Sequence, residues 1–98
     1  MIPKTFTLGG VTWKVKYKKK ILDENRDELR GQCDWDKATI FLSKFDEGKP
    51  IGDDTLEQTF YHEAIHAMLI VMDHPLKYDE PFVSTFATLL HQLEKTKK

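Results

Sequence analysis

The sequence predicts an α+β fold in which a small antiparallel sheet of about four strands precedes two packed helices. The chain has 98 residues, enough for a modest core, so residues 1–98 are expected to form a single domain. Residues 1–45 alternate apolar and polar side chains between turn-forming residues, which is typical of strands. Residues 54–96 instead repeat apolar side chains every three or four positions, as amphipathic helices do.

The first two strands are expected to form a hairpin. Residues 5–8 and 11–17 flank Gly9-Gly10, and a glycine pair between two such runs is a hairpin signal. In the second run apolar side chains alternate with threonine and lysine, so one face should be buried and the other solvated. The side chains expected on the buried face are Val11, Trp13, Val15 and Tyr17.

A second pair of strands is expected at residues 30–35 and 38–43, joined near Asp36-Lys37. Ile40 and Leu42 should point inward, and both Trp13 and Trp35 should fill the core between sheet and helices. Residues 23–28 are predicted to be a charged turn, and residues 44–53, which contain Gly48, Pro50 and Gly52, a loop.

The first helix is predicted to run from Asp54 to about Met72. Glu57 follows Asp54 by three positions, which favours a capping arrangement at the start. His74-Pro75 should end the helix, because the residue before a proline is pushed out of helical angles. The expected core stripe of this helix is Leu56, Phe60, Ala64, Ala67 and Val71.

The second helix is predicted to begin after Asp79, which is a favourable N-cap residue, with Pro81 tolerated in the first turn. It should continue to about residue 96. Its expected buried stripe is Phe82, Phe86, Leu89 and Leu93.

Composition argues against several classes of function. The net charge of −1 provides no general attraction to nucleic acid or anionic membranes, and no run of 18 apolar residues could span a bilayer. The N-terminal residues carry no signal-peptide pattern, so a cytoplasmic location is expected. Cys33 is the only cysteine, which excludes an internal disulfide and favours a small buried apolar residue. A nucleic-acid-binding alternative rests on basic side chains that are better explained as the solvated face of a strand: Lys14, Lys16, Lys18, Lys19 and Lys20.

The most informative pattern is His62-Glu63-Ala64-Ile65-His66, which spells H-E-x-x-H inside the first predicted helix. Residues four apart on a helix lie about 40° apart and one turn along, so His62 and His66 can offer nitrogens to one ion. Glu63 then lies beside the first ligand, where a carboxylate can act as a general base on water. Two imidazoles, one base and an open coordination position form the arrangement of a zinc hydrolase.

A catalytic zinc usually has three protein ligands, so a third is expected. Leu69 and Met72 occupy the positions of the extended H-E-x-x-H-x-x-G-x-x-H pattern, which excludes that arrangement. Asp73 lies about 10 Å along the helix from His66, and His74 would need a sharp return of the chain. Glu80 fits best, because a short turn would bring the start of the second helix beside the first. The alternative for Glu80 is a favourable charge at a helix N-terminus.

This pattern resembles the gluzincin metallopeptidases, and most of all the small minigluzincins and the phage-type ImmA/IrrE-like metallopeptidases. The resemblance covers residues 54–94 and rests on H-E-x-x-H followed by Glu80 and, at helical spacing, Val83, Phe86-Ala87 and Leu89-Leu90. It implies a minimal zincin-like domain with Zn²⁺ held by His62, His66 and Glu80, and with Glu63 as the general base. It also implies a peptide or protein substrate that pairs with a sheet-edge strand, for which residues 38–43 are the candidate.

Two questions stay open at the level of sequence. The same fold could serve as a catalytically silent, zinc-bound module that docks a partner protein, although Glu63 would then have no purpose. The group that stabilises the oxyanion is not identified, and the available side chains are each better explained by structural roles: His74, Tyr78 and His91. The sequence does not indicate an oligomeric state.

Overall fold

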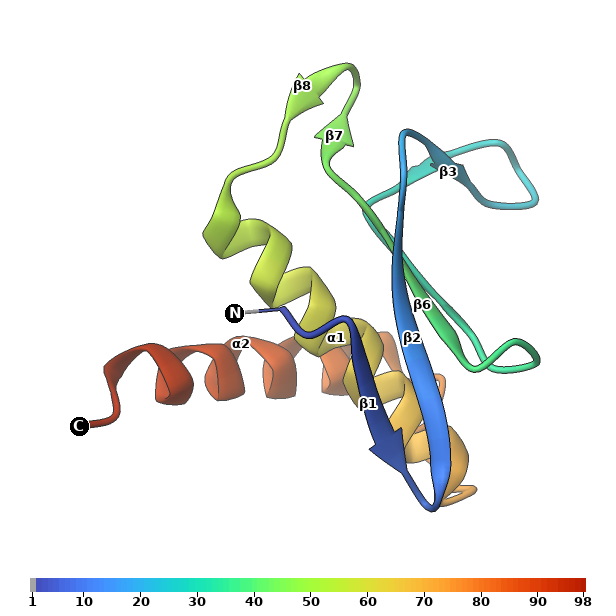
Figure 1. Ribbon diagram of the computed structural model, residues 1–98, viewed down its shortest axis with the longest axis vertical. Helices are drawn as coiled ribbons and strands as arrows, with labels where there is room; N and C mark the ends of the chain where they lie inside the picture. The colour runs from blue at the N-terminus through green and yellow to red at the C-terminus, as the bar shows by residue number, and fades with distance from the viewer. Residues whose placement is uncertain (1) are drawn as a thin grey trace.

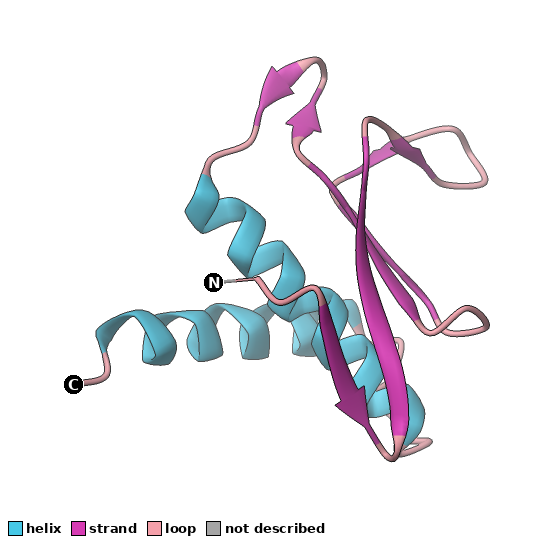
Figure 2. Ribbon diagram, in the orientation of Figure 1, coloured by secondary structure: helices cyan, strands magenta, loops and turns pink. Residues whose placement is uncertain are grey.

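The computed structural model describes residues 2–98 and confirms the α+β class, with a four-stranded sheet and two packed helices (Figures 1 and 2). The strand order in this sheet is β1-β2-β6-β5. Helix α1 packs on the sheet, and α2 crosses α1. The elements are β1 (Thr5–Leu8), β2 (Val11–Lys18), β3 (Ile21–Leu22), β4 (Glu28–Leu29), β5 (Gly31–Asp34), β6 (Thr39–Ser43), β7 (Phe45–Asp46), β8 (Lys49–Pro50), α1 (Asp53–Val71) and α2 (Glu80–Thr96).

Both predicted hairpins are present. β1 pairs antiparallel with β2 around Gly9 and Gly10, whose φ angles of 56° and 81° lie in the left-handed region that glycine enters at no steric cost. β5 pairs antiparallel with β6 around a tight turn in which Ala38 N–H donates to the Trp35 carbonyl at 3.1 Å. Local sequence therefore determines both of these pairings.

The prediction of a purely antiparallel sheet is wrong for one pair, because β2 and β6 run parallel. A parallel pair needs a long crossover connection, and residues 19–38 provide it through the β3–β4 ribbon and β5. Residues 44–53, predicted to be a loop, contain the short β7–β8 hairpin.

The strand at residues 38–43 is not an edge strand, contrary to the prediction. β6 lies between β2 and β5, and all five of its residues are buried. Within the described residues 2–98, the edge strand beside α1 is β5, which pairs with β6 on one side only. The buried Ile40 and Leu42 confirm the predicted inward face, but burial of the whole strand follows from its two neighbours, which the strand's own sequence does not reveal.

The core between sheet and α1 is made from the middle of each element, which corrects the prediction that the whole alternating face of residues 11–17 is buried. Trp13 is buried, whereas Val11 and Tyr17 at the ends of β2 are exposed. Trp35 is 58% exposed at the β5–β6 turn, so its predicted core role is wrong. The buried residues of this core are Trp13, Ile40, Leu42, Leu56, Phe60, Ala64 and Ala67.

The start of α1 differs from the prediction. Gly52 is the N-cap residue and no side chain caps the helix, so the expected Asp54 capping arrangement is absent. Asp54 instead accepts a hydrogen bond from Lys95 Nζ at 2.5 Å, which joins the first turn of α1 to the last turns of α2. At the other end of α1, Val71 is 40% exposed rather than buried.

Helix α2 begins as predicted but buries a different face. Asp79 Oδ1 accepts a hydrogen bond from Phe82 N–H at 3.0 Å, which confirms the N-cap. The buried residues are Val83, Ala87 and His91, whereas Phe86, Leu89 and Leu93 of the predicted stripe are exposed. Small Val83 and Ala87 pack against Ile65 and Leu69 of α1, so side-chain size rather than hydrophobicity selects the contact face. Neither helix within residues 2–98 has the length and apolar character needed to cross a bilayer.

Candidate metal centre

The two histidines of the H-E-x-x-H pattern lie on one side of α1, as the helical repeat requires. Their ring centroids are 4.9 Å apart. His66 is buried and His62 is half-buried, and both line a cleft between α1 and the edge strand β5. Burial also lowers the pKa of His62, with His66 adding to the effect and Glu80 opposing it. A histidine in this environment favours the neutral form, which is the form that binds metal.

A compact turn brings the chain back to this site. Asp73 has a φ of 49° at the end of α1, and His74 N–H donates to the Leu69 carbonyl at 2.9 Å. His74 Nδ1 then accepts a hydrogen bond from Leu76 N–H at 3.0 Å. This turn is the sharp reversal that the short spacing between His66 and Glu80 demands, and His74 has a structural role in it.

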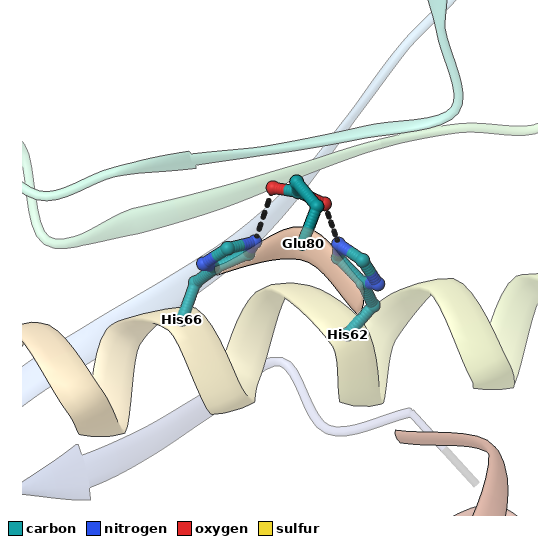
Figure 3. A group of neighbouring side chains, drawn as sticks. All are labelled: His62, His66 and Glu80. Atoms are coloured by element: carbon teal, nitrogen blue, oxygen red, sulfur yellow. Dashed lines mark hydrogen bonds and ion pairs between the residues drawn. The ribbon is translucent and has the colours of Figure 1, made fainter. Parts of the chain in front are cut away.

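Glu80, at the start of α2, reaches both histidines (Figure 3). Its Oε1 lies 2.8 Å from His66 Nε2 and its Oε2 lies 3.0 Å from His62 Nε2. One ligand atom from each of the three residues falls within 4.8 Å of the others. The structure thus brings together the three ligands predicted from sequence.

This donor set fits zinc. Two imidazole nitrogens and one carboxylate oxygen match the three protein ligands of a catalytic zinc site, with a fourth position left for water or substrate. The same combination of borderline and hard donors is less suited to calcium or magnesium, which prefer oxygen ligands alone.

The backbone of the turn fixes the orientation of His66. Its Nδ1–H donates to the Lys77 carbonyl at 2.9 Å, so Nε2, which lies 2.8 Å from Glu80 Oε1, is the ring nitrogen left available to a metal ion. Lys77 is held in turn by Asp73, whose Oδ1 lies 2.5 Å from Lys77 Nζ. Metal-binding histidines commonly donate their second nitrogen in this way, which sets the tautomer and the ring orientation.

Glu63 is a buried carboxylate beside this group. It is only 9% exposed, and no hydrogen bond from residues 2–98 to its carboxylate is seen. Burial raises the pKa of Glu63 to about 7; the neighbouring His66 acts in the opposite direction and the charge of Glu80 adds to the increase. A carboxylate whose pKa lies near neutrality can both accept and return a proton, which suits a general base.

Gly31 of β5 is a site residue that the sequence did not single out. A Cβ added there would lie 2.8 Å from Thr59 Cγ2, 3.0 Å from Glu63 Cγ and 3.3 Å from Glu63 Oε2. Only glycine therefore lets the edge strand approach α1 this closely. The packing of β5 against Glu63 is a long-range feature that no local pattern encodes.

Replacing Gly31 by alanine should therefore displace β5 or Glu63. We expect a loss of about 1–3 kcal/mol in the free energy of unfolding, typical of overpacking. Chemical denaturation of the metal-free protein measures it. Adding Thr59→Ser, which removes the clashing Cγ2 but keeps the hydroxyl that donates to the Thr55 carbonyl, should recover part of the loss. Gly52→Ala, where an added Cβ meets nothing within 4 Å, is the control and should lose only the N-cap preference for glycine over alanine. Equal effects of the two alanines would contradict the close approach.

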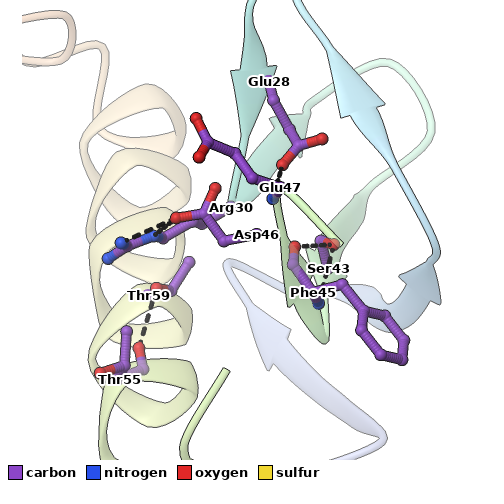
Figure 4. A network of polar contacts seen from close by, with 8 residues as sticks. All are labelled: Glu28, Arg30, Ser43, Phe45, Asp46, Glu47, Thr55 and Thr59. Carbon is purple, nitrogen blue, oxygen red and sulfur yellow. Dashed lines mark hydrogen bonds and ion pairs between the residues drawn. The ribbon is translucent and has the colours of Figure 1, made fainter. Parts of the chain in front are cut away.

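Polar contacts stabilise the wall of the cleft that lies opposite α1 (Figure 4). Arg30 donates to Asp46 Oδ2 from Nη2 at 3.0 Å and from Nε at 3.3 Å, and Glu47 N–H donates to Glu28. These contacts fasten the β7–β8 hairpin to the segment that leads into β5. The cleft has a volume of about 720 Å³ and is open to solvent.

The remaining candidate residues lie outside the group formed by His62, His66 and Glu80. Tyr78 lines the cleft and is 74% exposed. His91 is buried on another part of the interface between the helices, with Nε2 3.8 Å from Glu57 Oε1. Cys33 lines the cleft, but burial raises the pKa of its thiol to about 12, with Glu63 and Asp34 adding to the increase. A thiol that stays protonated is a poor metal ligand.

Comparisons with known proteins add no assignment. No protein-family model, curated protein or solved structure matches this chain.

Proposed function

We propose that this protein is a zinc-dependent peptidase in which His62, His66 and Glu80 hold the metal and Glu63 is the general base. One observation carries the proposal: Glu80 meets both histidines of the H-E-x-x-H helix, while a buried carboxylate with a pKa near 7 stands next to them. A binding module or a structural zinc site has no need for such a base. A cytoplasmic location stays a prediction from the sequence.

The proposed chemistry follows from the placement of these groups. A bound zinc ion would lower the pKa of water toward ~7 and polarise the peptide carbonyl. Glu63 would take the proton from the attacking water and return it to the departing amine, for which its raised pKa is suited. The Lys77 carbonyl keeps His66 in the required tautomer throughout, through the Nδ1–H hydrogen bond.

The substrate is proposed to be an extended peptide that pairs with β5. Among residues 2–98 this strand pairs only with β6, and three of its residues, Gly31, Gln32 and Cys33, line the cleft. Addition of a strand to a free sheet edge is a common mode of peptide recognition, because main-chain hydrogen bonds supply affinity for any sequence. The proposal moves the docking strand from residues 38–43 to Gly31–Asp34.

The decisive experiment measures zinc and hydrolysis on the same preparation. Protein purified without chelator should contain close to one zinc per chain and should cleave an unfolded protein or a pool of unstructured peptides. A chelator should abolish cleavage, and added zinc should restore it, because the ion is needed for each turnover. Bound zinc without any cleavage would favour the silent docking module. A folded protein that takes up no zinc would refute both.

A further inference from the structure

Helix α2 carries a stripe of large apolar side chains that the rest of residues 2–98 does not cover. Phe86, Leu89 and Leu93 are 46%, 60% and 58% exposed, and half-buried Phe82 continues the stripe toward the start of the helix. Together with Thr85 and Leu90 they line a shallow apolar groove. We call Phe82, Phe86, Leu89 and Leu93 the α2 stripe. Figure 1 shows α2 crossing α1 and extending away from the sheet toward the C-terminus.

The α2 stripe is separate from the face that α2 uses within the chain. Val83, Ala87 and His91 are buried, and at 100° per residue they lie roughly 120° around the helix from the stripe. The two faces can therefore be occupied at the same time. A partner on the stripe would add a helix contact without disturbing the contact with α1.

The spacing of the α2 stripe is that of a helix–helix seam. Its members are four, three and four residues apart, which keeps a row of side chains facing one partner helix. Residues 81–93 contain no Asp, Glu, Lys or Arg, although these types make up 32% of the chain. A helix face meant only for solvent would normally carry charges at this spacing.

Charge at the two ends of α2 favours a second copy of the same helix, running antiparallel. At 100° per residue, Asp79 at the N-terminal end and Lys97 at the C-terminal end lie on the same flank of the stripe, roughly 50° from its centre. Glu80 and Lys95 belong to the opposite face, where they contact the two histidines and Asp54, and Lys97 also pairs with Glu94 of its own helix at 3.0 Å. In an antiparallel pair the acidic end of one helix lies beside the basic end of the other, at both ends of the contact. The helix dipoles are then also opposed, which is favourable. A two-fold axis between two copies of α2 produces both the charge pairing at each end and the antiparallel dipoles, because the same surface of each copy then meets itself.

We propose that the α2 stripe is a dimer interface, in which two copies of this chain pack their α2 helices antiparallel. A contiguous exposed apolar patch without charges often marks an interaction surface. Four side chains that are only about half exposed cover less than the roughly 800 Å² per partner of a standard stable interface. The dimer should therefore form in a concentration-dependent equilibrium. The proposal does not depend on the metal centre or on peptidase activity.

Sedimentation equilibrium of the full chain over a range of concentrations tests this proposal. The apparent mass should rise from 11.5 kDa toward twice that value as concentration increases. Leu89→Glu places a charge in the seam and should hold the protein at the monomer mass at every concentration. Ser84→Glu adds the same charge to an exposed position on the other side of α2 and should dimerise like the wild type.

Circular dichroism establishes that the variants fold, and Leu93→Glu repeats the test one turn away should Leu89→Glu fail to fold. A wild-type protein that stays monomeric at all concentrations would refute the proposal. So would dimers that survive both glutamate substitutions. A monomer that binds lipid vesicles through this helix would refute it too, and would assign the α2 stripe to a membrane surface.

Discussion

Glu63→Gln should lower kcat for peptide hydrolysis by about 10²–10⁴-fold, the usual contribution of a general base. The amide has nearly the shape of the carboxylate but cannot take a proton from water. Zinc content should not change, because Glu63 is not among the residues whose ligand atoms converge. Steady-state kinetics together with metal analysis on one preparation measure both quantities. Glu94→Gln, the same chemical change at an exposed position on α2, is the control and should have no effect.

The same variant should stabilise the metal-free protein above neutral pH. The pKa of Glu63 is raised from the ordinary 4.5 to about 7 in the folded protein, so folding favours the protonated form. The stability that this proton contributes is fully present below pH 4.5 and is lost as the pH rises through about 7. The loss is on the order of 3 kcal/mol, from 1.36 kcal/mol per pKa unit. Glutamine removes this dependence. A variant that loses hydrolysis without gaining stability at pH 8 would place Glu63 in a less buried environment than the structure shows.

Much of the candidate site could be predicted because it is encoded locally. The helical repeat alone places His62 and His66 on one side of α1, and the ligand count together with the short turn points to Glu80. Gly31 could not be found in this way. Its role depends on how closely β5 approaches Thr59 and Glu63, and that distance is set by the packing of elements far apart in sequence.

The same distinction between local and long-range features applies to the fold. The β1–β2 and β5–β6 hairpins are local and were predicted, whereas the parallel β2–β6 pair joins segments about twenty residues apart through a crossover. Helix α2 illustrates a second limit. Its most hydrophobic face predicted burial of Phe86, Leu89 and Leu93, but α1 packs instead on the face where Val83 and Ala87 allow close approach. Hydrophobic periodicity identifies a helix face that is favoured to leave water. It does not identify which part of the same chain, or which other molecule, covers that face.

The ligand role of Glu80 predicts a large loss of zinc affinity when this residue is shortened by one methylene. Zinc sites contribute roughly 12 kcal/mol in total, so one ligand of four is worth roughly 3 kcal/mol, or about a hundredfold in the dissociation constant. Glu80→Asp should show a loss of this order, because the shorter side chain no longer reaches both Nε2 atoms from the start of α2. Competition with a zinc indicator measures the affinity, and His66→Ala provides the reference for loss of a ligand.

Aspartate at this position also distinguishes the two explanations for Glu80, a metal ligand or a favourable charge at the N-terminus of the helix. It keeps a negative charge in the first turn of α2, where an acidic side chain is worth about 0.3–1 kcal/mol through the helix dipole. If Glu80 served only as a favourable charge at the helix N-terminus, Glu80→Asp would leave zinc affinity unchanged. Glu80→Gln would then lower only the stability of the metal-free protein. Asp54→Asn tests the other cluster of potential ligands, Asp54, Glu57 and His91, and should leave zinc affinity unchanged. A loss in Asp54→Asn that matches the loss in Glu80→Asp would move the zinc site to that cluster.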